Sequence, residues 1–412
     1  MSRKEFAGGP VPRYLLLGSA VFLTAFGLTM VYSASSVSAL VKESSSVHYF
    51  VRQLAFVGLG AVLAFIAARF DYRRFQGALG MQAWWASVAL LVVTYGLGVV
   101  RGGARRWIPF GFVNLQPSEF AKIACVLVAA ALAIEWQRGR LQTSTYLGRI
   151  GFFVGVPAAL IVFQPDLGTA VLLAVGVAIV LFLGGVEMRW VIAAGALLAL
   201  FGAFAISIES YRLGRVMTAL NPWLDPSGKG YQTIQALLAF GTGGLKGVGL
   251  GLSRQKFFYL PEAHTDFIFA IIGEEVGLIG TLTVVAAFVI LLYAGVRIAM
   301  GARDQYGRLV AGALTGMLSF QAVLNMAAVT GVFPVTGKPL PFLSYGGSSM
   351  FVTMLSVGLI LSVSKYGACA PRALRMRPRN EEQARASGDE RRRDGRTRIP
   401  RADSGRTARR GA

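Results

Sequence analysis

The chain has 412 residues, of which 54% are hydrophobic and only 15% are charged, and its mean hydropathy is +0.57. This composition excludes an ordinary soluble domain and is typical of a polytopic membrane protein. The net charge of +21 is large, but it gathers in short loops and in an arginine-rich C-terminal tail, so no nucleic acid is expected as a partner.

Ten apolar segments approach the roughly 20 residues that a helix needs to cross a bilayer. They predict an all-α polytopic protein of about ten transmembrane helices, near residues 14–34, 50–68, 81–100, 117–136, 149–163, 168–185, 189–207, 267–296, 308–330 and 346–364. Residues 1–13 are then an N-terminal tail, 14–366 the membrane domain and 367–412 a disordered tail. The first apolar run is too long for a signal-peptide core, so we interpret it as an uncleaved anchor.

The distribution of arginine predicts the orientation. Arg69, Arg73, Arg138 and Arg303 fall in short loops on the same side as both termini, and the positive-inside rule identifies that side as the cytoplasm. We therefore expect a plasma-membrane protein whose arginine tail lies near anionic membrane lipids. The outer loops are then 101–116, 164–167, 208–266 and 331–345.

The loop 208–266, between the seventh and eighth helices, is the largest. Tyr231, Ile234 and Leu238 recur in it at helical spacing, which predicts a short amphipathic helix at the membrane interface. The glycines that follow, from Gly241 to Gly251, indicate either a flexible connection or a close approach of backbone to a phosphate.

Two outer arginines are exceptions to the positive-inside rule, and a tryptophan follows them. Arg105 and Arg106 lie on the outer side, where guanidinium groups suit phosphate or pyrophosphate oxygens. Interaction with lipid headgroups is the alternative. Trp107 beside them is either an interfacial residue or a platform for a sugar ring.

Acidic residues also stand at the ends of helices. Glu119 and Lys122 are three residues apart at the start of the fourth helix, so they share a face and are expected to pair, as a structural ion pair or as part of a site. Asp166 in a tight turn is expected to cap the sixth helix rather than to catalyse.

The sequence His264-Thr265-Asp266 ends the large loop and opens the eighth apolar segment. Asp266 is predicted as the N-cap of that helix and also as a carboxylate able to accept a proton from a bound hydroxyl. Glu274 and Glu275 follow two turns later, and we expect them to pair with another helix.

The last outer loop is stiffened by proline and carries Lys338, a second outer cation. It continues into Ser344-Tyr345-Gly346-Gly347-Ser348, which lacks the spacing of a nucleotide phosphate loop. The two cysteines, Cys125 and Cys369, form no metal-binding spacing, and no metal ligands are predicted.

Taken together, these motifs resemble the SEDS family (shape, elongation, division and sporulation), the FtsW/RodA/SpoVE group. The resemblance covers about residues 14–366 and rests on six motifs in the order of the family: 31–35, 105–108, 116–122, 164–169, 264–269 with 273–275, and 334–349. It implies a peptidoglycan glycosyltransferase on the outer face of the plasma membrane. Its substrate is lipid II, a disaccharide-peptide on undecaprenyl pyrophosphate, and its usual partner is a class B penicillin-binding protein.

The resemblance also assigns roles. The key aspartate of the family corresponds to Asp266, which we expect to act as general base or to orient the acceptor hydroxyl, and its tryptophan corresponds to Trp107. The expected substrate-binding residues are Arg105, Arg106, Trp107, Glu119, Lys122, His264, Thr265, Lys338, Ser344, Tyr345, Gly346, Gly347 and Ser348. Cations would hold the pyrophosphate leaving group, and direct displacement with one carboxylate implies inversion at the anomeric carbon. No cofactor is assigned, and a divalent cation, Mg²⁺ or Mn²⁺, stays open.

The wording of the motifs favours the division type, with other division proteins as partners, over the elongation type. A lipid II flippase is the main alternative, because Glu119, Glu274 and Glu275 would suit a path through the membrane. A scaffold that only positions a penicillin-binding protein is the third.

Overall fold

The computed structural model describes residues 10–43, 45–101, 104–111, 113–208, 214, 217, 221–228 and 230–367. The arginine-rich tail, which the sequence predicts to be disordered, lies outside these residues. The same holds for the first nine residues and for most of 209–220.

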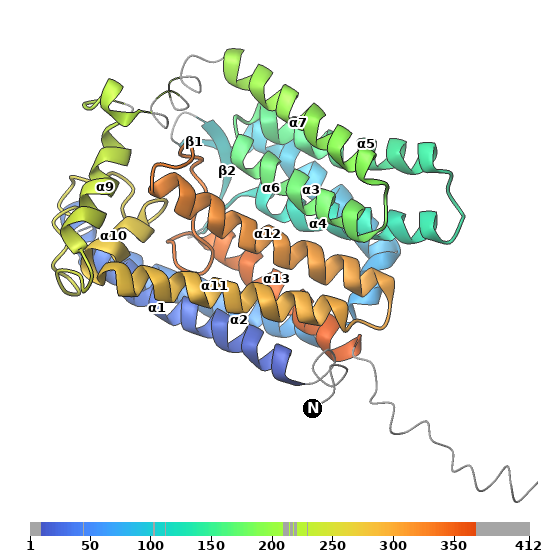
Figure 1. Ribbon diagram of the computed structural model, residues 1–412, viewed down its shortest axis with the longest axis horizontal. Helices are drawn as coiled ribbons and strands as arrows, with labels where there is room; N and C mark the ends of the chain where they lie inside the picture. Colours follow the sequence, from blue (N-terminus) through green and yellow to red (C-terminus); the bar gives the residue numbers. More distant parts are fainter. Residues whose placement is uncertain are drawn as a thin grey trace, which may run out of the picture. The chain divides into compact units, whose positions relative to one another are not determined.

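A helix covers each of the ten predicted apolar segments (Figure 1). These helices are α1 (Pro10–Glu43), α2 (His48–Arg69), α3 (Ala78–Leu97), α4 (Pro117–Gln137), α5 (Thr143–Phe163), α6 (Leu167–Leu183), α7 (Met188–Ile208), α11 (Gly277–Met300), α12 (Gln305–Val329) and α13 (Gly347–Tyr366). Within the described part of the chain, 8 helices are long and apolar enough to cross a membrane. Helix α6 is apolar but has 17 residues. The prediction of a polytopic helical membrane protein is confirmed.

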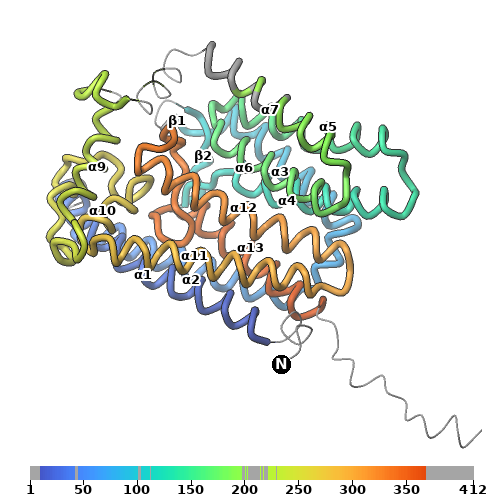
Figure 2. Tube along the Cα trace, in the orientation of Figure 1, coloured from blue at the N-terminus to red at the C-terminus, as the bar shows by residue number. Residues whose placement is uncertain are grey.

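Burial separates the central helix from those at the edge. In α4, 89% of the most apolar window is buried, against 22% in α2 and in α5. Helix α4 packs against α3, α5, α6 and α12, whereas α2 and α5 expose apolar residues along most of their length. Segments far apart in the sequence lie side by side, as α1 does with α11 in Figure 2.

One end of the bundle carries short loops that connect the helices. We call it the basic end. The Tyr72 hydroxyl, on the 3₁₀ helix η1 (Tyr72–Gln76), donates to Asp304, and Arg73 Nε lies 2.9 Å from Asp304 Oδ2. The backbone N–H of Arg303 donates to the carbonyl of Gly367 after α13, at 2.6 Å. The loops after α2 and α11 therefore meet the end of α13.

The opposite end, which we call the sheet end, carries a small sheet that the sequence analysis did not predict. Strands β1 (Val99–Arg101), β2 (Ala104–Phe110) and β3 (Val113–Leu115) pair antiparallel in the order β1-β2-β3. Two of the strands have only 3 residues, too few to give a recognisable alternation of apolar and polar residues.

The eighth predicted helix, 267–296, is not continuous. It divides into α10 (Ile268–Glu275) and α11, with Val276 between them. Gly277 has φ +72°, and a Cβ at this position would overlap the backbone N–H of Gly247, so only glycine fits this turn. Phe267 precedes the first residue of α10, and the prediction that Asp266 is the N-cap is therefore wrong.

The short helix predicted in the large loop is confirmed as α9 (Tyr231–Gly243), which follows the 3₁₀ turn η2 (Pro222–Leu224). The predicted apolar face is not buried along its whole length, since Ile234 is buried and Leu238, four residues later, is exposed. The glycines after it are not merely flexible. A Cβ on Gly243 would overlap the carbonyl of Gly273, so this glycine lets α9 lie against α10.

Candidate functional site

Four charged side chains are buried together at the sheet end. Glu119 and Lys122 come from α4, Asp166 from the turn before α6, and Lys338 from the segment between α12 and α13; each is at most 2% exposed. We call them the charge cluster. Charges buried this deeply are stable only when they are paired.

The pairing within the charge cluster is alternating. Lys122 Nζ lies 3.0 Å from Glu119 Oε2, which confirms the predicted pair. Lys338 Nζ lies 2.9 Å from Asp166 Oδ1 and 3.7 Å from Glu119 Oε1. Two cations thus balance two carboxylates, and the cluster has no net charge when all four are ionised.

Asp166 caps α6, as predicted, but it does more. Its Oδ1 accepts the backbone N–H of Thr169 at 3.2 Å, and its Oδ2 accepts the Thr169 hydroxyl at 2.7 Å and the Gln116 side-chain amide at 2.8 Å. Burial alone would raise the pKa of Asp166, but Lys338 and Arg106 outweigh burial and hold this pKa well below its usual range.

Lys338, predicted as a second cation on the outer side, is buried, since it is only 2% exposed. Gly168 at the start of α6 makes room for it, because a Cβ there would come within 2.8 Å of Lys338 Cγ. The lysine therefore crosses over α6 to reach Asp166 rather than pointing outward.

Two amides on α12 connect this cluster to Asp266. The Asn325 side-chain amide donates to the carbonyl of Asp266 and to that of Lys338, each at 2.8 Å. Gln321, one turn earlier, accepts from Lys122 Nζ at 3.2 Å and donates to the carbonyl of Pro339 at 2.9 Å. Neither amide was predicted from the sequence, although two amides four residues apart in an apolar helix are a readable signal.

Asp266 itself is half-buried at the rim of the charge cluster. Its Oδ2 would lie 3.6 Å from a Cβ placed on Gly337, so the carboxylate faces the residue that precedes Lys338. The Thr265 hydroxyl donates to Glu262 Oε2 at 2.7 Å, which keeps this turn compact.

Three aromatic rings lie next to Asp266 in the chain or in space. The ring of Tyr49, from α2, is 4.9 Å from that of His264 and 5.2 Å from that of Tyr345, and the last two are 5.7 Å apart. The backbone N–H of Tyr345 donates to the carbonyl of His264 at 3.0 Å. We call these rings the aromatic trio. His264 and Tyr345 were predicted site residues, whereas Tyr49 carried no signal in the sequence.

The remaining residues of that segment secure the start of α13. The Ser348 hydroxyl accepts the Gln116 backbone N–H at 2.9 Å and donates to Asn114 O at 2.8 Å. Gln53 donates to the Ser344 carbonyl and accepts from Gly346 N–H, both at 3.2 Å. A Cβ on Gly347 would lie 3.2 Å from the Phe56 ring.

The outer arginines lie on β2 and satisfy carbonyls at helix ends. Arg105 Nη1 donates to Tyr95 O at 2.8 Å, and Arg106 donates to Gln164 O at 3.0 Å and to Pro165 O. Arg106 therefore stands beside the turn that holds Asp166, while Arg105 is exposed next to α3. Trp107 is half-buried on the same strand.

The chain matches the family model described as cell cycle protein, FtsW/RodA/SpoVE, over residues 13–368. The chain belongs to this family. Among its relatives, stage V sporulation protein E of Bacillus subtilis is 42% identical over 86% of this chain and 97% of the relative. The probable peptidoglycan glycosyltransferase FtsW of Geobacter metallireducens is 42% identical over 86% and 95%.

Solved structures agree with these relatives. The rod shape determining protein RodA of Thermus thermophilus has a TM-score of 0.64 at 28% identity, covering 87% of this chain and 98% of that one. A peptidoglycan synthase complex that coordinates polymerization and crosslinking contains a chain with a TM-score of 0.69 at 29% identity, covering 85% and 97%. The predicted family and enzyme class, a peptidoglycan glycosyltransferase, are confirmed.

In this FtsW/RodA/SpoVE chain, Glu274 and Glu275 lie apart from the charge cluster. The Ser33 hydroxyl on α1 donates to Glu275 Oε1 at 2.7 Å, which confirms that this glutamate pairs with another helix. Glu274 accepts the backbone N–H of Arg254 at 2.9 Å and the hydroxyl of Ser253. Both carboxylates serve the large loop rather than the residues around Asp266.

An apolar cavity, which the sequence did not reveal, runs beside α4. It has a volume of about 490 Å³ and lies between α2, α3, α4 and α13. Its walls are Leu63, Ile66, Ala67, Phe70, Phe75, Ala83, Ala86, Ser87, Leu90, Leu115, Phe120, Ile123, Ala124, Leu127, Leu355 and Leu359. Leu115 on β3 is one of its walls, so one end of the cavity lies at the sheet end.

Proposed function

We propose that this FtsW/RodA/SpoVE protein polymerises lipid II, with Asp266 as the general base. The observation that carries the proposal is the bridge made by Asn325, whose amide binds the carbonyls of Asp266 and Lys338 at 2.8 Å each. This bridge ties the backbone of Asp266, whose carboxylate is half-buried, to the backbone of Lys338 in the charge cluster. A proton acceptor near two buried lysines suits a reaction in which a hydroxyl attacks and a pyrophosphate leaves.

The proposed reaction is a single displacement. The acceptor sugar hydroxyl forms a bond to the anomeric carbon of the donor and gives its proton to Asp266. The bond from that carbon to the pyrophosphate oxygen breaks, and the pyrophosphate leaves with the electron pair. Attack on the face opposite the leaving group inverts the anomeric carbon.

The cations have different parts in this proposal. Arg106 stands beside the Asp166 turn and Arg105 is exposed, so both are near the path of an incoming pyrophosphate. Lys338 and Lys122 are already paired. Each lysine stabilises the leaving group by releasing its carboxylate partner and binding a phosphate oxygen instead. Both partners are negatively charged, so the lysine stays paired.

The aromatic trio and the apolar cavity supply the other surfaces that lipid II requires. The rings of Tyr49, His264 and Tyr345 offer flat apolar faces next to Asp266, which suit the faces of sugar rings. The cavity along α4 is almost entirely apolar and suits part of a prenyl chain.

A resident metal does not fit the site. The described residues contain no group of three His, Cys, Asp or Glu side chains able to hold an ion, and the buried carboxylates are engaged by lysines. A divalent cation, Mg²⁺ or Mn²⁺, would therefore have to arrive with the pyrophosphate of the substrate.

The orientation that we propose puts the sheet end outside. Short loops at the basic end carry Arg69, Arg73, Arg74, Arg138 and Arg303, which supports a cytoplasmic location for that end. The first helix, α1, starts at Pro10, and the last helix, α13, ends just before Gly367. Both of these helix ends lie at the basic end of the bundle (Figure 1). Both termini are then cytoplasmic.

Division is the process that we propose, because relatives at about 40% identity are named FtsW and stage V sporulation protein E. The proposed partner is a class B penicillin-binding protein, supported by the similar chain that works within a peptidoglycan synthase complex. Depleting the native division or elongation polymerase in a host and expressing this chain distinguishes the two roles. Rescue of division alone is expected, and rescue of elongation alone would contradict the division role.

The activity is tested by lipid II polymerisation with the purified protein and its co-expressed partner. Asp266→Asn keeps the size of the side chain and should abolish polymer formation without loss of thermal stability. Glu262→Gln is the matched control: Glu262 is an exposed carboxylate in the same turn, the amide keeps an oxygen that can accept the Thr265 hydroxyl, and the variant should polymerise like the wild type. Equal polymer from the Asp266→Asn protein would remove Asp266 from catalysis. Lipid II transport without polymer would favour the flippase.

A further inference from the structure

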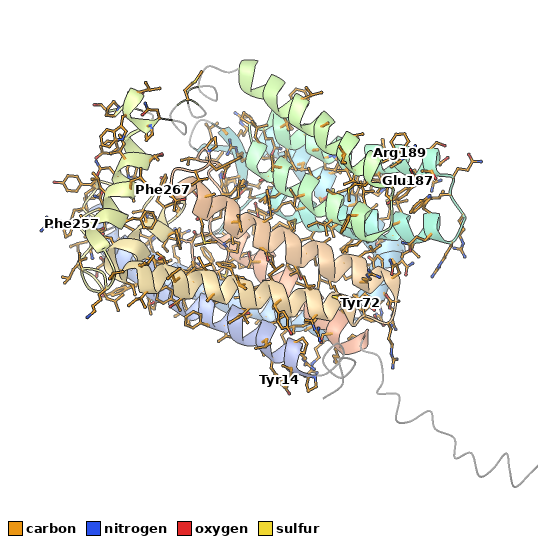
Figure 3. All side chains as sticks on the ribbon, in the orientation of Figure 1. Tyr14, Tyr72, Glu187, Arg189, Phe257 and Phe267 are labelled. Atoms are coloured by element: carbon orange, nitrogen blue, oxygen red, sulfur yellow. The ribbon has the colours of Figure 1, made fainter. Side chains whose placement is uncertain are left out.

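The segment 244–259, between α9 and α10, presents large apolar side chains to the outside. We call it the apolar loop. Six of these side chains are between 52% and 69% exposed: Leu245, Leu250, Leu252, Phe257, Phe258 and Tyr259. In Figure 3, Phe257 lies at the outer edge of this end of the molecule, whereas Phe267, which is 1% exposed, lies within it. A contiguous apolar patch of this kind marks a surface that something covers.

The apolar loop continues the exposed apolar stripe of α11. The backbone N–H of Leu278 donates to Gly244 O at 2.9 Å, and that of Ile279 donates to Leu245 O at 3.3 Å. Leu278, Ile279 and Leu282 are exposed on α11, a helix long and apolar enough to span a membrane. The loop therefore starts at the depth of the first turn of α11 and extends the exposed stripe of that helix.

The length of α11 sets this depth. Its 24 residues extend about 36 Å at 1.5 Å per residue, against about 30 Å of hydrocarbon. With α11 centred in the bilayer, its first turn reaches the boundary between acyl chains and headgroups. The apolar loop thus belongs at the interface rather than in the middle of the membrane.

Backbone N–H groups of the apolar loop are hydrogen-bonded within the protein and do not depend on water. The N–H groups of Val248 and Gly249 donate to the carbonyls of Glu274 and Glu275, at 2.9 and 3.0 Å. The carboxylate of Glu274 accepts from Arg254 N–H at 2.9 Å. Irregular backbone at membrane depth is tolerated when the protein itself satisfies its polar groups. This requirement explains why two buried glutamates stand here without a role near Asp266.

The basic side chains of the apolar loop also differ in burial: one points into the protein and two are exposed. Lys256 is 5% exposed and turns inward, with its ammonium group donating to Gly251 O and lying 3.7 Å from Glu275 Oε1. Lys246 and Arg254 are exposed, and their long side chains reach headgroup phosphates from the interface. Outward apolar groups with flexible cations beside them match a phospholipid surface.

We propose that the apolar loop inserts its six apolar side chains into the headgroup and acyl boundary of the leaflet at the sheet end. It is an interfacial anchor rather than a docking site for protein. Asp266 follows Tyr259 by seven residues, so the anchor fixes the height of the turn that carries Asp266 relative to the lipid surface.

Spin-label accessibility in nanodiscs of phosphatidylethanolamine and phosphatidylglycerol tests this. Phe258→Cys is labelled in a full-length Cys369→Ser protein; Cys125 is 0% exposed and should stay unlabelled, as the protein without Phe258→Cys verifies. The label should collide with oxygen and lose its collisions with a water-soluble nickel chelate, like a label at Leu282→Cys. A label at Ser227→Cys, on an exposed polar position, should show the reverse.

A second position, Leu250→Cys, keeps the test independent of how one variant folds, and it should behave like Phe258→Cys. Collisions with the nickel chelate at both positions, as at Ser227→Cys, would overturn the proposal. Protection from both oxygen and the chelate would also overturn it, because that pattern means a protein surface covers the loop.

Discussion

The sheet end buries two pairs of carboxylates in different ways. In the charge cluster, Glu119 and Asp166 are balanced by lysine side chains. Glu274 and Glu275 are held mainly by hydroxyls and backbone N–H groups, with one lysine 3.7 Å from Glu275. A lysine can exchange its partner for a phosphate oxygen without moving the backbone, whereas a carboxylate held by backbone N–H groups fixes the loop. The comparison separates acids suited to a reaction from acids that build the site.

The largest expected effect comes from removing a cation of the charge cluster. Lys338→Met leaves Asp166 without its nearest cation, and breaking a buried pair in this way costs about 3–5 kcal/mol. Thermal unfolding in detergent should show a Tm lowered by many degrees.

The double variant Lys338→Met with Asp166→Asn sharpens this comparison. Removing both charges should restore much of the Tm, but not polymerisation, because the proposed leaving-group cation is gone. A double variant no more stable than Lys338→Met alone would contradict pairing as the reason for the two charges.

Next in size is Glu274→Gln. An amide keeps one oxygen acceptor but loses the charge and cannot accept N–H bonds on both atoms, so the free energy of unfolding should fall by about 1–3 kcal/mol. Hydrogen exchange should increase most in 247–256, the part of the apolar loop that Glu274 and Glu275 hold. Unchanged protection there would show that the glutamate does not organise the loop.

Asn325→Leu tests the bridge that Asn325 makes between the Asp266 turn and the segment that carries Lys338. The leucine removes the donor shared by the Asp266 and Lys338 carbonyls, and two lost hydrogen bonds cost about 1–3 kcal/mol in stability. Polymerisation should fall by more than stability explains, with the largest loss in kcat. Ser319→Ala on the same helix is the control and should keep both activity and Tm. Loss of Tm with normal kcat would assign Asn325 a structural role alone.

The smallest effect is expected at the basic end. Burial alone would raise the pKa of Asp304, but hydrogen bonds from Tyr72, Gly307 and Arg73 outweigh it and lower this pKa below 3.8. The carboxylate therefore stabilises the fold above the unfolded pKa, and this contribution is lost as the pH falls through the folded pKa. Asp304→Asn should lower the Tm at neutral pH by the equivalent of about 1 kcal/mol or less. The advantage of the wild type should begin to shrink near pH 4, the ordinary pKa of aspartate, and should vanish once the pH is below the folded pKa; an advantage that does not shrink at all in acid would contradict the assignment.

Much of the fold could be predicted because a bilayer imposes length and polarity on each helix. The ten apolar segments were found in this way, and so were the Glu119–Lys122 pair and the Asp166 cap, since both depend on neighbours within one turn. The break at Val276 and the sheet 99–115 were missed. A glycine with φ +72° and strands of 3 residues leave no periodic signal.

The sequence by itself determined the membrane class and the family, and it singled out Asp266 as the proposed base. The tertiary structure alone decided which charges meet: Lys338 turns inward over Gly168 to Asp166, and Asn325 joins Asp266 to Lys338. It also decided that Tyr49 joins His264 and Tyr345. The physical reason is that hydropathy and helix caps act over a few residues, whereas a buried charge is stabilised by whatever partner the packing of distant helices brings within about 3 Å.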